Sequence, residues 1–384
     1  MKKSLIALAV AGVIAAPAAF ADTTIYGSAN LSYDNVRSGA TDANGGSQST
    51  NHISSNVSKI GFKGSEDLGD GLTAVWQMEE QVNMVSSGAG STATANGGSV
   101  TSGTATFAAR DTFAGLSSAT LGTVIAGIHD TPYKMASRGF DLFADTIADN
   151  RSLMGNLVGD IRVNNALAYI SPAFSGVTLA AATSFGGELP VASPAPSSKG
   201  SAWSLAALYG AGPLTVNAAY QTITIGDTGT GTLGAGLLGT VQGDKTTAFK
   251  LGGSYAMDAF QVNAVYEKLG SSGTGVSNAL DRTNFYLAGK FNLNANDTVK
   301  AAYTRAGNSG DGAGGTADAS GAKQFSLGYD HNLSKHTSVY ALYSKLSNDT
   351  NAGYTFSQAT SVNGAPGSAN AAPSVLSLGM KHAF

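Results

Sequence analysis

Apolar and polar residues alternate along segment after segment of this chain, and this pattern restricts the possible folds more than any other feature. In residues 24–34, Ile25, Leu31 and Tyr33 share one face of an extended strand, and mainly polar residues form the other face. A period of two is that of a β-strand, whose successive side chains point to opposite sides. The chain is therefore predicted to be an all-β protein. The same pattern returns in later segments such as 72–79, 203–209, 260–266, 285–291 and 339–343.

The chain carries few charges for its length, although it is not strongly apolar. Only 12% of its 384 residues are charged, whereas a soluble domain usually has about 25%. No window after residue 21 approaches 18 uncharged apolar residues, which excludes helical membrane spans. A transmembrane β-barrel explains both facts, because lipid-facing and lumen-facing residues alternate along each of its strands.

The first 21 residues have the three parts of a secretory signal peptide. Two lysines form a basic start, residues 5–16 form an apolar stretch, and the sequence Ala-Phe-Ala before residue 22 is a small-x-small cleavage site. We therefore expect residues 1–21 to be removed and residues 22–384 to form one transmembrane barrel domain. Loss of two lysines leaves the mature chain mildly acidic, which argues against nucleic acid as a partner.

The residue types that usually carry metals or redox chemistry are scarce. The chain contains no cysteine, which rules out disulfides, thiolate metal sites and cysteine nucleophiles. Its five histidines are scattered, with no spacing typical of metal ligands. No cofactor, metal or catalytic residue is expected.

Sixteen candidate strands can be counted, and their connections are of two kinds. Seven short turns alternate with eight long loops rich in Gly, Ser, Thr and Asn. Short periplasmic turns, longer external loops and an even strand number are typical of bacterial outer-membrane barrels. A ring of about 16 to 18 strands leaves an aqueous channel. The segments are 24–36, 51–65, 71–84, 106–116, 120–129, 160–171, 176–186, 201–210, 213–225, 245–256, 259–269, 282–293, 298–306, 322–332, 336–347 and 374–384.

The third long loop, residues 130–159, differs in composition from its surroundings. Asp141, Asp145 and Asp149 follow one another at i, i+4 and i+8, so a helix would place them on one face, and like charges at this spacing cost a few tenths of a kcal/mol. We predict that this loop folds into the barrel, packs its apolar side on the wall and narrows the channel with acids facing water. The alternative is a solvated surface loop. The apolar residues are Phe140, Leu142, Phe143 and Ile147, and the charged ones are Asp130, Lys134, Arg138, Asp141, Asp145, Asp149 and Arg151.

Charged side chains are also expected on the wall opposite this constriction loop. Strand parity points four cations into the lumen, because their sequence neighbours are apolar and suit lipid. Carboxylates on the loop and cations on the wall would create a transverse field, which low-dielectric surroundings strengthen. Each cation could instead be an ordinary solvated side chain, since parity determines the face and not the height. The expected wall residues are Lys59, Lys63, Glu79, Arg110 and Arg162.

Several stretches together resemble one protein family. They are IYGSANLSYD near the start, SKIGFKGSEDLGDGLTAVWQMEE (58–80), RDTFAGLSSATLGTVIAG (110–127), NNALAYISPAFSGV (164–177) and the terminal LGMKHAF. These stretches are similar to the trimeric general porins of beta-proteobacteria and Neisseria, which are Gram-negative. The resemblance implies a sixteen-stranded antiparallel homotrimer in the outer membrane, with an inward-folded third loop. Its partners would be outer-membrane lipid, lipopolysaccharide, ions and small hydrophilic solutes, and Lys59 and Arg110 would match basic wall positions of the family.

The chain departs from the family pattern at several wall positions. Family members often carry arginine where this chain has Ile125, Ile128 and Ala168. With fewer wall cations and three loop aspartates, we expect weak charge selectivity that leans toward cations. The resemblance also implies that the terminal Phe384 is a signal for the barrel-assembly machinery, and the same residue would suit a lipid interface as an aromatic side chain.

Three other kinds of protein share some of these features. An extracellular β-helix would show a fixed short repeat, and none is found. A barrel hydrolase needs a nucleophile, a histidine and an acid at the rim, and only His52 and His129 lie near strand ends there. The sequence does not exclude a receptor or adhesin that acts through long loops such as 86–104. We predict a general diffusion porin that forms a water-filled channel and is not an enzyme.

Overall fold

A computed structural model describes most of the chain after the expected signal peptide, and residues 1–21 lie outside the described part. Within the described ranges, no helix is long and apolar enough to span a membrane. The secondary structure there consists almost entirely of strands. The described ranges are 22–41, 47–85, 108–155, 159–185, 200–226, 243–273, 278–356 and 369–384.

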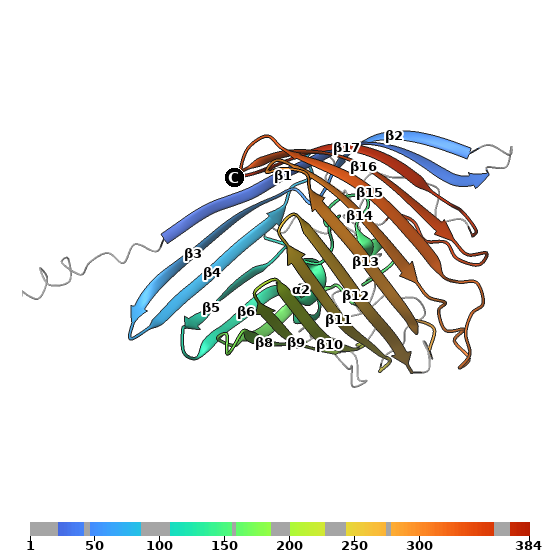
Figure 1. Ribbon diagram of the computed structural model, residues 1–384. Coiled ribbons are helices and arrows are strands. Elements are labelled where there is room, and N and C mark those ends of the chain that lie inside the picture. The colour runs from blue at the N-terminus through green and yellow to red at the C-terminus, as the bar shows by residue number, and fades with distance from the viewer. Residues whose placement is uncertain are drawn as a thin grey trace, which may run out of the picture.

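All strands belong to one antiparallel sheet, and each pairs with its neighbours along the chain, except that β2 and β3 do not pair with each other (Figure 1). Within the described ranges, the two helical elements, α2 (Pro132–Arg138) and the 3-10 turn η1 (Asn150–Ser152), both lie between β6 and β7. The strands are β1 (Asp22–Thr41), β2 (Ser47–Ser55), β3 (Lys59–Gly69), β4 (Leu72–Gln81), β5 (Thr112–Ser118), β6 (Gly122–Asp130), β7 (Arg162–Ile170), β8 (Val177–Ser184), β9 (Ser201–Ala211), β10 (Leu214–Thr224), β11 (Lys245–Met257), β12 (Phe260–Ser272), β13 (Arg282–Asn292), β14 (Asp297–Ala306), β15 (Ala322–Asn332), β16 (Thr337–Asn348) and β17 (Ser374–Ala383).

The first strand closes the sheet into a barrel. One edge of β1 pairs with β17 over residues 28–37, while its other edge pairs with β3 in its first part and with β2 in its second part. Strands β2 and β3 are separated only by residues 56–58, where Val57 has a φ of 55°. They are therefore two parts of one barrel strand. The ring has sixteen strands, which confirms the predicted fold class.

The two faces of the wall differ as the alternation predicts. Along β13, the outward side chains of Phe285 and Leu287 are 51% and 55% exposed, whereas the inward Tyr286 and Ala288 are only 2% and 3% exposed. Exposed large apolar side chains are placed in this way all around the barrel, where a bilayer would cover them. Further outward examples are Trp203, Leu205, Phe325, Leu327, Leu376 and Leu378.

The last residue of the chain helps to close the ring. Phe384 and Gly27 exchange two backbone hydrogen bonds, from Gly27 N to Phe384 O at 3.0 Å and from Phe384 N to Gly27 O at 3.1 Å. The ring of Phe384 lies against the α-carbon of Gly27, and a Cβ added there would lie 2.6 Å from this ring and 2.5 Å from the carbonyl oxygen of Lys59. Glycine is therefore required at position 27 for this close approach.

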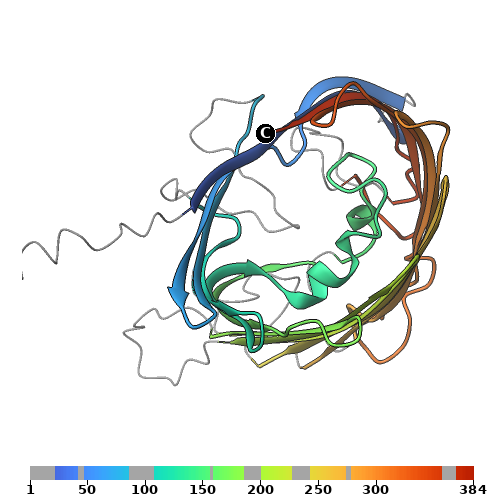
Figure 2. The ribbon, with the colours of Figure 1, turned by 60° about the vertical axis from the view of Figure 1, so that its left-hand side comes forward.

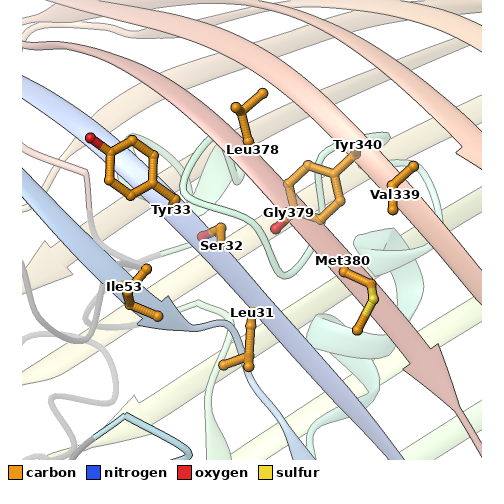
Figure 3. Close-up of a pocket in the computed structure, with 9 residues that line it drawn as sticks. All are labelled: Leu31, Ser32, Tyr33, Ile53, Val339, Tyr340, Leu378, Gly379 and Met380. Carbon is orange, nitrogen blue, oxygen red and sulfur yellow. The ribbon is translucent and has the colours of Figure 1, made fainter.

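A second glycine acts at the same seam, on β17. A Cβ added at Gly379 would lie 2.1 Å from the ring of Tyr340, so this tyrosine packs directly against the strand from the inside. Its hydroxyl donates to Asn30 Oδ1 at 3.2 Å. On the outside, the apolar side chains of Leu31, Ile53 and Met380 border a shallow hollow, with Gly379 and Tyr340 at its floor (Figure 3).

Deleting Phe384 is expected to reduce the amount of folded barrel, because two backbone hydrogen bonds and a ring contact are lost at the closing seam. Two such bonds contribute roughly 1–3 kcal/mol. The yield of folded protein on semi-native gels measures this loss. Phe174→Ala is the control, because Phe174 is 82% exposed in a short turn. The remaining folded barrels should keep wild-type conductance, and an unchanged yield after the deletion would contradict a closing role for Phe384.

Candidate functional site

The loop between β6 and β7 begins with one short helix and then turns irregularly. Helix α2 starts after Thr131, whose side chain accepts a hydrogen bond from Lys134 N, and it has a proline in its first turn. The helix ends at Arg138 and is followed by Gly139. The loop enters the barrel and runs along the inner side of the wall (Figure 2).

Residues 141–149 do not form the helix that would have placed Asp141, Asp145 and Asp149 on one face. Asp141 and Asp149 lie outside any helix, and Asp145 lies in a turn with a φ of 58°, which is incompatible with a right-handed helix. The carboxylate of Asp141 accepts hydrogen bonds from the backbone N–H groups of Phe143 and Asn150, and that of Asp149 accepts one from Asp145 N. Aspartate side chains compete in this way with helical hydrogen bonds, and here the local bonds win.

Polar groups of the wall hold the loop along most of its length. Asn217 Nδ2 donates to Ala136 O at 2.7 Å, and Asn263 Nδ2 donates to Phe140 O at 2.7 Å. Near the far end of the loop, Asn30 Nδ2 on β1 donates to the carbonyl oxygen of Asp145 at 2.8 Å. The loop therefore follows the inner wall from β6 to the closing seam. Further bonds join Tyr133 N to Ser204 Oγ, Leu142 N to the hydroxyl of Tyr286, and Gln324 Nε2 to Ala148 O.

Apolar side chains of the loop pack on the same inner wall. Phe140, Phe143 and Ile147 are at most 4% exposed, and they belong to one buried cluster with wall residues such as Val265 and Leu342. Leu142 packs partly buried against this cluster. The structure therefore places these four residues of the loop where the sequence analysis expected an apolar side.

A charge cluster lies within the loop itself. Arg138 Nη2 lies 2.9 Å from Asp149 Oδ2 and 3.3 Å from Asp145 Oδ1, and Arg151 Nη2 lies 3.0 Å from Asp149 Oδ2. Asp141 joins the cluster through Arg138 Nη1 at 3.7 Å. The side chains of Asp141 and Asp149 are 0% exposed, whereas that of Asp145 is 41% exposed. Of the three aspartates, Asp145 alone presents its carboxylate to water, which differs from the expectation that all three would.

Burial and neighbouring charges shift the pKa values of the two buried aspartates of the loop in opposite directions. Burial and the negative charge of Asp149 raise the pKa of Asp141 to about 6, although Arg138 opposes this shift. Burial would also raise the pKa of Asp149, but Arg138 and Arg151 hold this pKa well below its ordinary range. Asp149 is therefore the fixed negative charge around which both arginines gather.

Lys59, Lys63 and Glu79 lie on β3 and β4, and Arg110 lies just before β5. Lys59 Nζ lies 3.2 Å from Glu79 Oε2, and Arg110 Nε lies 2.5 Å from Glu79 Oε1. The hydroxyl of Tyr26 also donates to Glu79 at 3.0 Å, and Lys63 Nζ lies 5.2 Å from the centre of the Tyr26 ring. Three cations, Lys59, Lys63 and Arg110, thus surround the single carboxylate of Glu79, so this group of four residues carries a net positive charge.

The remaining expected residues gather where the loop leaves the wall. Arg162 lies 2.7 Å from Asp111 and 2.8 Å from Asp130, and Lys134 Nζ lies 2.9 Å from Asp130. Their charges balance within this group. Asp130, Lys134 and Arg162 therefore fix the start of the loop to the barrel and add little net charge to the lumen.

A second buried charge group was missed in the sequence analysis. Lys250 Nζ lies 2.5 Å from Asp160 and 3.4 Å from Glu267, and the hydroxyl of Tyr133 donates to Glu267 at 2.8 Å. Glu267 also accepts from Gly155 N at 3.0 Å, so both ends of the loop are tied to it. Lys250 and Glu267 are directly opposite in the β11–β12 register. The sequence signal that could have revealed this group is a pair of opposite charges at inward positions of two neighbouring strands.

Among the described residues, no three His, Cys, Asp or Glu side chains are placed to bind a metal ion. The model of the Gram-negative porin family matches residues 5–352. The chain belongs to the Gram-negative porin family. It is thus related to channel-forming proteins of the outer membrane and not to enzymes, as the sequence analysis predicted.

Parts of the sequence also match individual outer-membrane proteins. The chain is 42% identical over 94 residues to the major outer membrane protein P.IB of Neisseria meningitidis serogroup A, a match that covers 23% of this chain and 27% of that protein. With P.IB of Neisseria gonorrhoeae the identity is 45% over 92 residues, which covers 23% and 26% of the two chains. The match thus spans about a quarter of these curated relatives.

Several solved structures have the same fold over nearly the whole length of this chain. An anion-selective porin from Comamonas acidovorans has a TM-score of 0.73 at 22% identity, covering 95% of this porin and 100% of that chain. Salmonella typhi OmpF in complex with daunomycin has a TM-score of 0.61 at 17% identity, covering 94% and 97%. A trimer form of Vibrio cholerae OmpT has a TM-score of 0.62 at 15% identity, covering 95% and 99%. At these identities the likeness establishes the fold.

Replacing Arg138 by methionine is expected to loosen the loop, because two buried carboxylates lose a shared cation. Breaking a buried ion pair by removing one partner costs about 3–5 kcal/mol. Single-channel recordings of Arg138→Met should show larger and noisier currents than the wild type. Arg37→Met is the matched control, since Arg37 is exposed on β1. Identical current levels and noise in both variants would show that Arg138 does not hold the loop.

Proposed function

We propose that this porin is a general diffusion channel for ions and small hydrophilic solutes. The observation that carries the proposal is a closed ring of sixteen strands with one loop folded into its lumen and anchored on the inner wall. A ring of this size encloses water, and a loop inside it reduces the opening. Solutes would pass without tight binding, as lumen side chains replace part of their hydration.

Charges on the loop and on the wall support weak selectivity. The loop offers the half-exposed Asp145, and the wall offers Lys59, Lys63 and Arg110, with Glu79 as their shared acid. Such an arrangement produces a transverse field across the opening. Because Asp141 and Asp149 are buried in ion pairs, they add little to a cationic preference. We infer a selectivity close to neutral, less cationic than three water-facing aspartates would give.

The same proposal includes an export signal and a trimeric assembly. Residues 1–21 would be the signal peptide and residues 22–384 the barrel, with residues 130–159 as its constriction loop. A homotrimer is supported by the shared fold with the trimer form of Vibrio cholerae OmpT. The apolar outer face of the wall suits outer-membrane lipid, lipopolysaccharide would meet its external side, and Phe384 would serve the barrel-assembly machinery.

Reversal potentials in a salt gradient test this function on purified protein in planar bilayers. The wild type should open in large steps and show a potential near zero. Asp145→Asn should move the potential toward anion preference, and Lys59→Gln together with Lys63→Gln should move it toward cation preference, because each change removes one side of the field. Asp70→Asn in an exposed turn is the control. Absence of conductance would contradict the channel, and a strong preference in the wild type would contradict weak selectivity.

A further inference from the structure

A group of buried polar side chains lies on the inner wall beside the far end of the constriction loop, and the function proposed above does not use it. At its centre, Asp34 of β1 has 0% exposure. Its Oδ2 accepts a hydrogen bond from Ser32 Oγ at 3.1 Å, while its Oδ1 has no hydrogen-bond partner among the described residues. None of the ion pairs found in the described part of the chain includes Asp34.

Polar side chains from both neighbouring strands surround this carboxylate. Ser377 of β17 and His52 of β2 are directly opposite Asp34, and Ser54 of β2 is opposite Ser32, one inward position along. Directly opposite side chains have Cβ atoms roughly 4.5–5.5 Å apart, and diagonal neighbours remain within reach. Ser54 and Ser377 are 0% and 1% exposed, and both hydroxyls lack a partner within the described ranges.

Unsatisfied atoms are concentrated at this place. Five buried side-chain polar atoms without a hydrogen-bond partner in the described ranges belong to this stretch of β1, β2 and β17 and the bulge between β2 and β3. A buried polar atom without a partner calls for an ion or a water molecule at the site. The five atoms are Asp34 Oδ1, His52 Nε2, Ser54 Oγ, Asn56 Oδ1 and Ser377 Oγ.

Charge decides between an ion and water. A carboxylate buried without a positive partner must either hold a proton or be balanced by a cation, because water does not neutralise its charge. His52, directly opposite on β2, forms no ion pair with Asp34 in the described part of the chain. Carboxylate, hydroxyl and amide oxygens are donors that hard cations prefer. A single carboxylate balances one positive charge, whereas a divalent ion would leave an uncompensated charge. We propose that Asp34, Ser54 and Ser377 bind an alkali-metal cation.

The site is connected to the anchor of the loop. Ser32 Oγ, which donates to Asp34, accepts from Asn56 Nδ2 at 2.8 Å. Asn56 also donates to the hydroxyl of Tyr340 at 3.3 Å, and this hydroxyl donates to Asn30, whose amide holds the loop at Asp145. Figure 3 shows Ser32 and Tyr340 together on this part of the seam. A bound cation would therefore stabilise the wall to which the loop is fastened.

Thermal unfolding of the folded full-length porin tests the site independently of conductance. Chlorides of sodium, potassium and N-methyl-D-glucamine are compared at equal ionic strength. The wild type should unfold a few degrees higher in one or both alkali salts, because binding to the folded state alone raises its stability. Asp34→Asn should abolish the difference. Asp70→Asn, which removes the same charge from an exposed turn, should keep it.

A second variant and a direct observation make the test decisive. Ser377→Ala keeps the charge and removes one ligand, so it should require a several-fold higher alkali concentration for the same stabilisation. Crystals soaked in thallium(I), a potassium analogue, should show an anomalous peak beside Asp34 that is absent in Asp34→Asn. Either the alkali-dependent shift or the peak, removed by Asp34→Asn, supports the site. Absence of both, a water molecule at the position, or stabilisation by calcium alone would overturn the proposal.

Discussion

The need to pair every backbone N–H and C=O group inside a bilayer governs this structure. No water is available in the hydrocarbon region, so a sheet that spans it must close on itself. Closure here depends on β1, which pairs with β17 on one edge and with β2 and β3 on the other. Gly27 and Gly379 let Phe384 and Tyr340 approach the strands closely at this seam. The seam is therefore both the end of the ring and the point to which the constriction loop is fastened.

Within the closed ring, buried charges decide where the loop lies. Asp149 with Arg138 and Arg151 holds the turns together, and Glu267 with Lys250 ties the loop ends to the wall. Such groups are costly to bury singly but are stable when each has its partners. The loop is thus held by a few specific polar contacts together with Phe143 and Ile147, and this fixes the position of the exposed Asp145.

Much of the fold could be predicted from the sequence because the period of two is a local property of each strand. The alternation around Phe285 and Leu287 translates directly into outward and inward side chains. The path of the loop could not be predicted in the same way. The i, i+4 spacing of Asp141 and Asp145 suggested a helix, but carboxylates that bind nearby backbone N–H groups ended it at Arg138. In the group around Glu267, the pairing of Lys250 with Glu267 follows from the register of the β11–β12 hairpin, but the contacts of Glu267 with Tyr133 and Gly155 depend on the path of the loop.

A pair of cysteines tests most directly whether the loop folds into a closed barrel and lies on its inner wall. The chain has no cysteine of its own, so Ala148→Cys and Gln324→Cys can be joined by a short thiol-specific linker. The carbonyl oxygen of Ala148 lies 3.0 Å from Gln324 Nε2. We expect nearly complete cross-linking in the folded protein, and none between Ala148→Cys and Lys335→Cys in an exposed turn. A loop that fails to cross-link to Gln324→Cys in the folded barrel would contradict the structure described above.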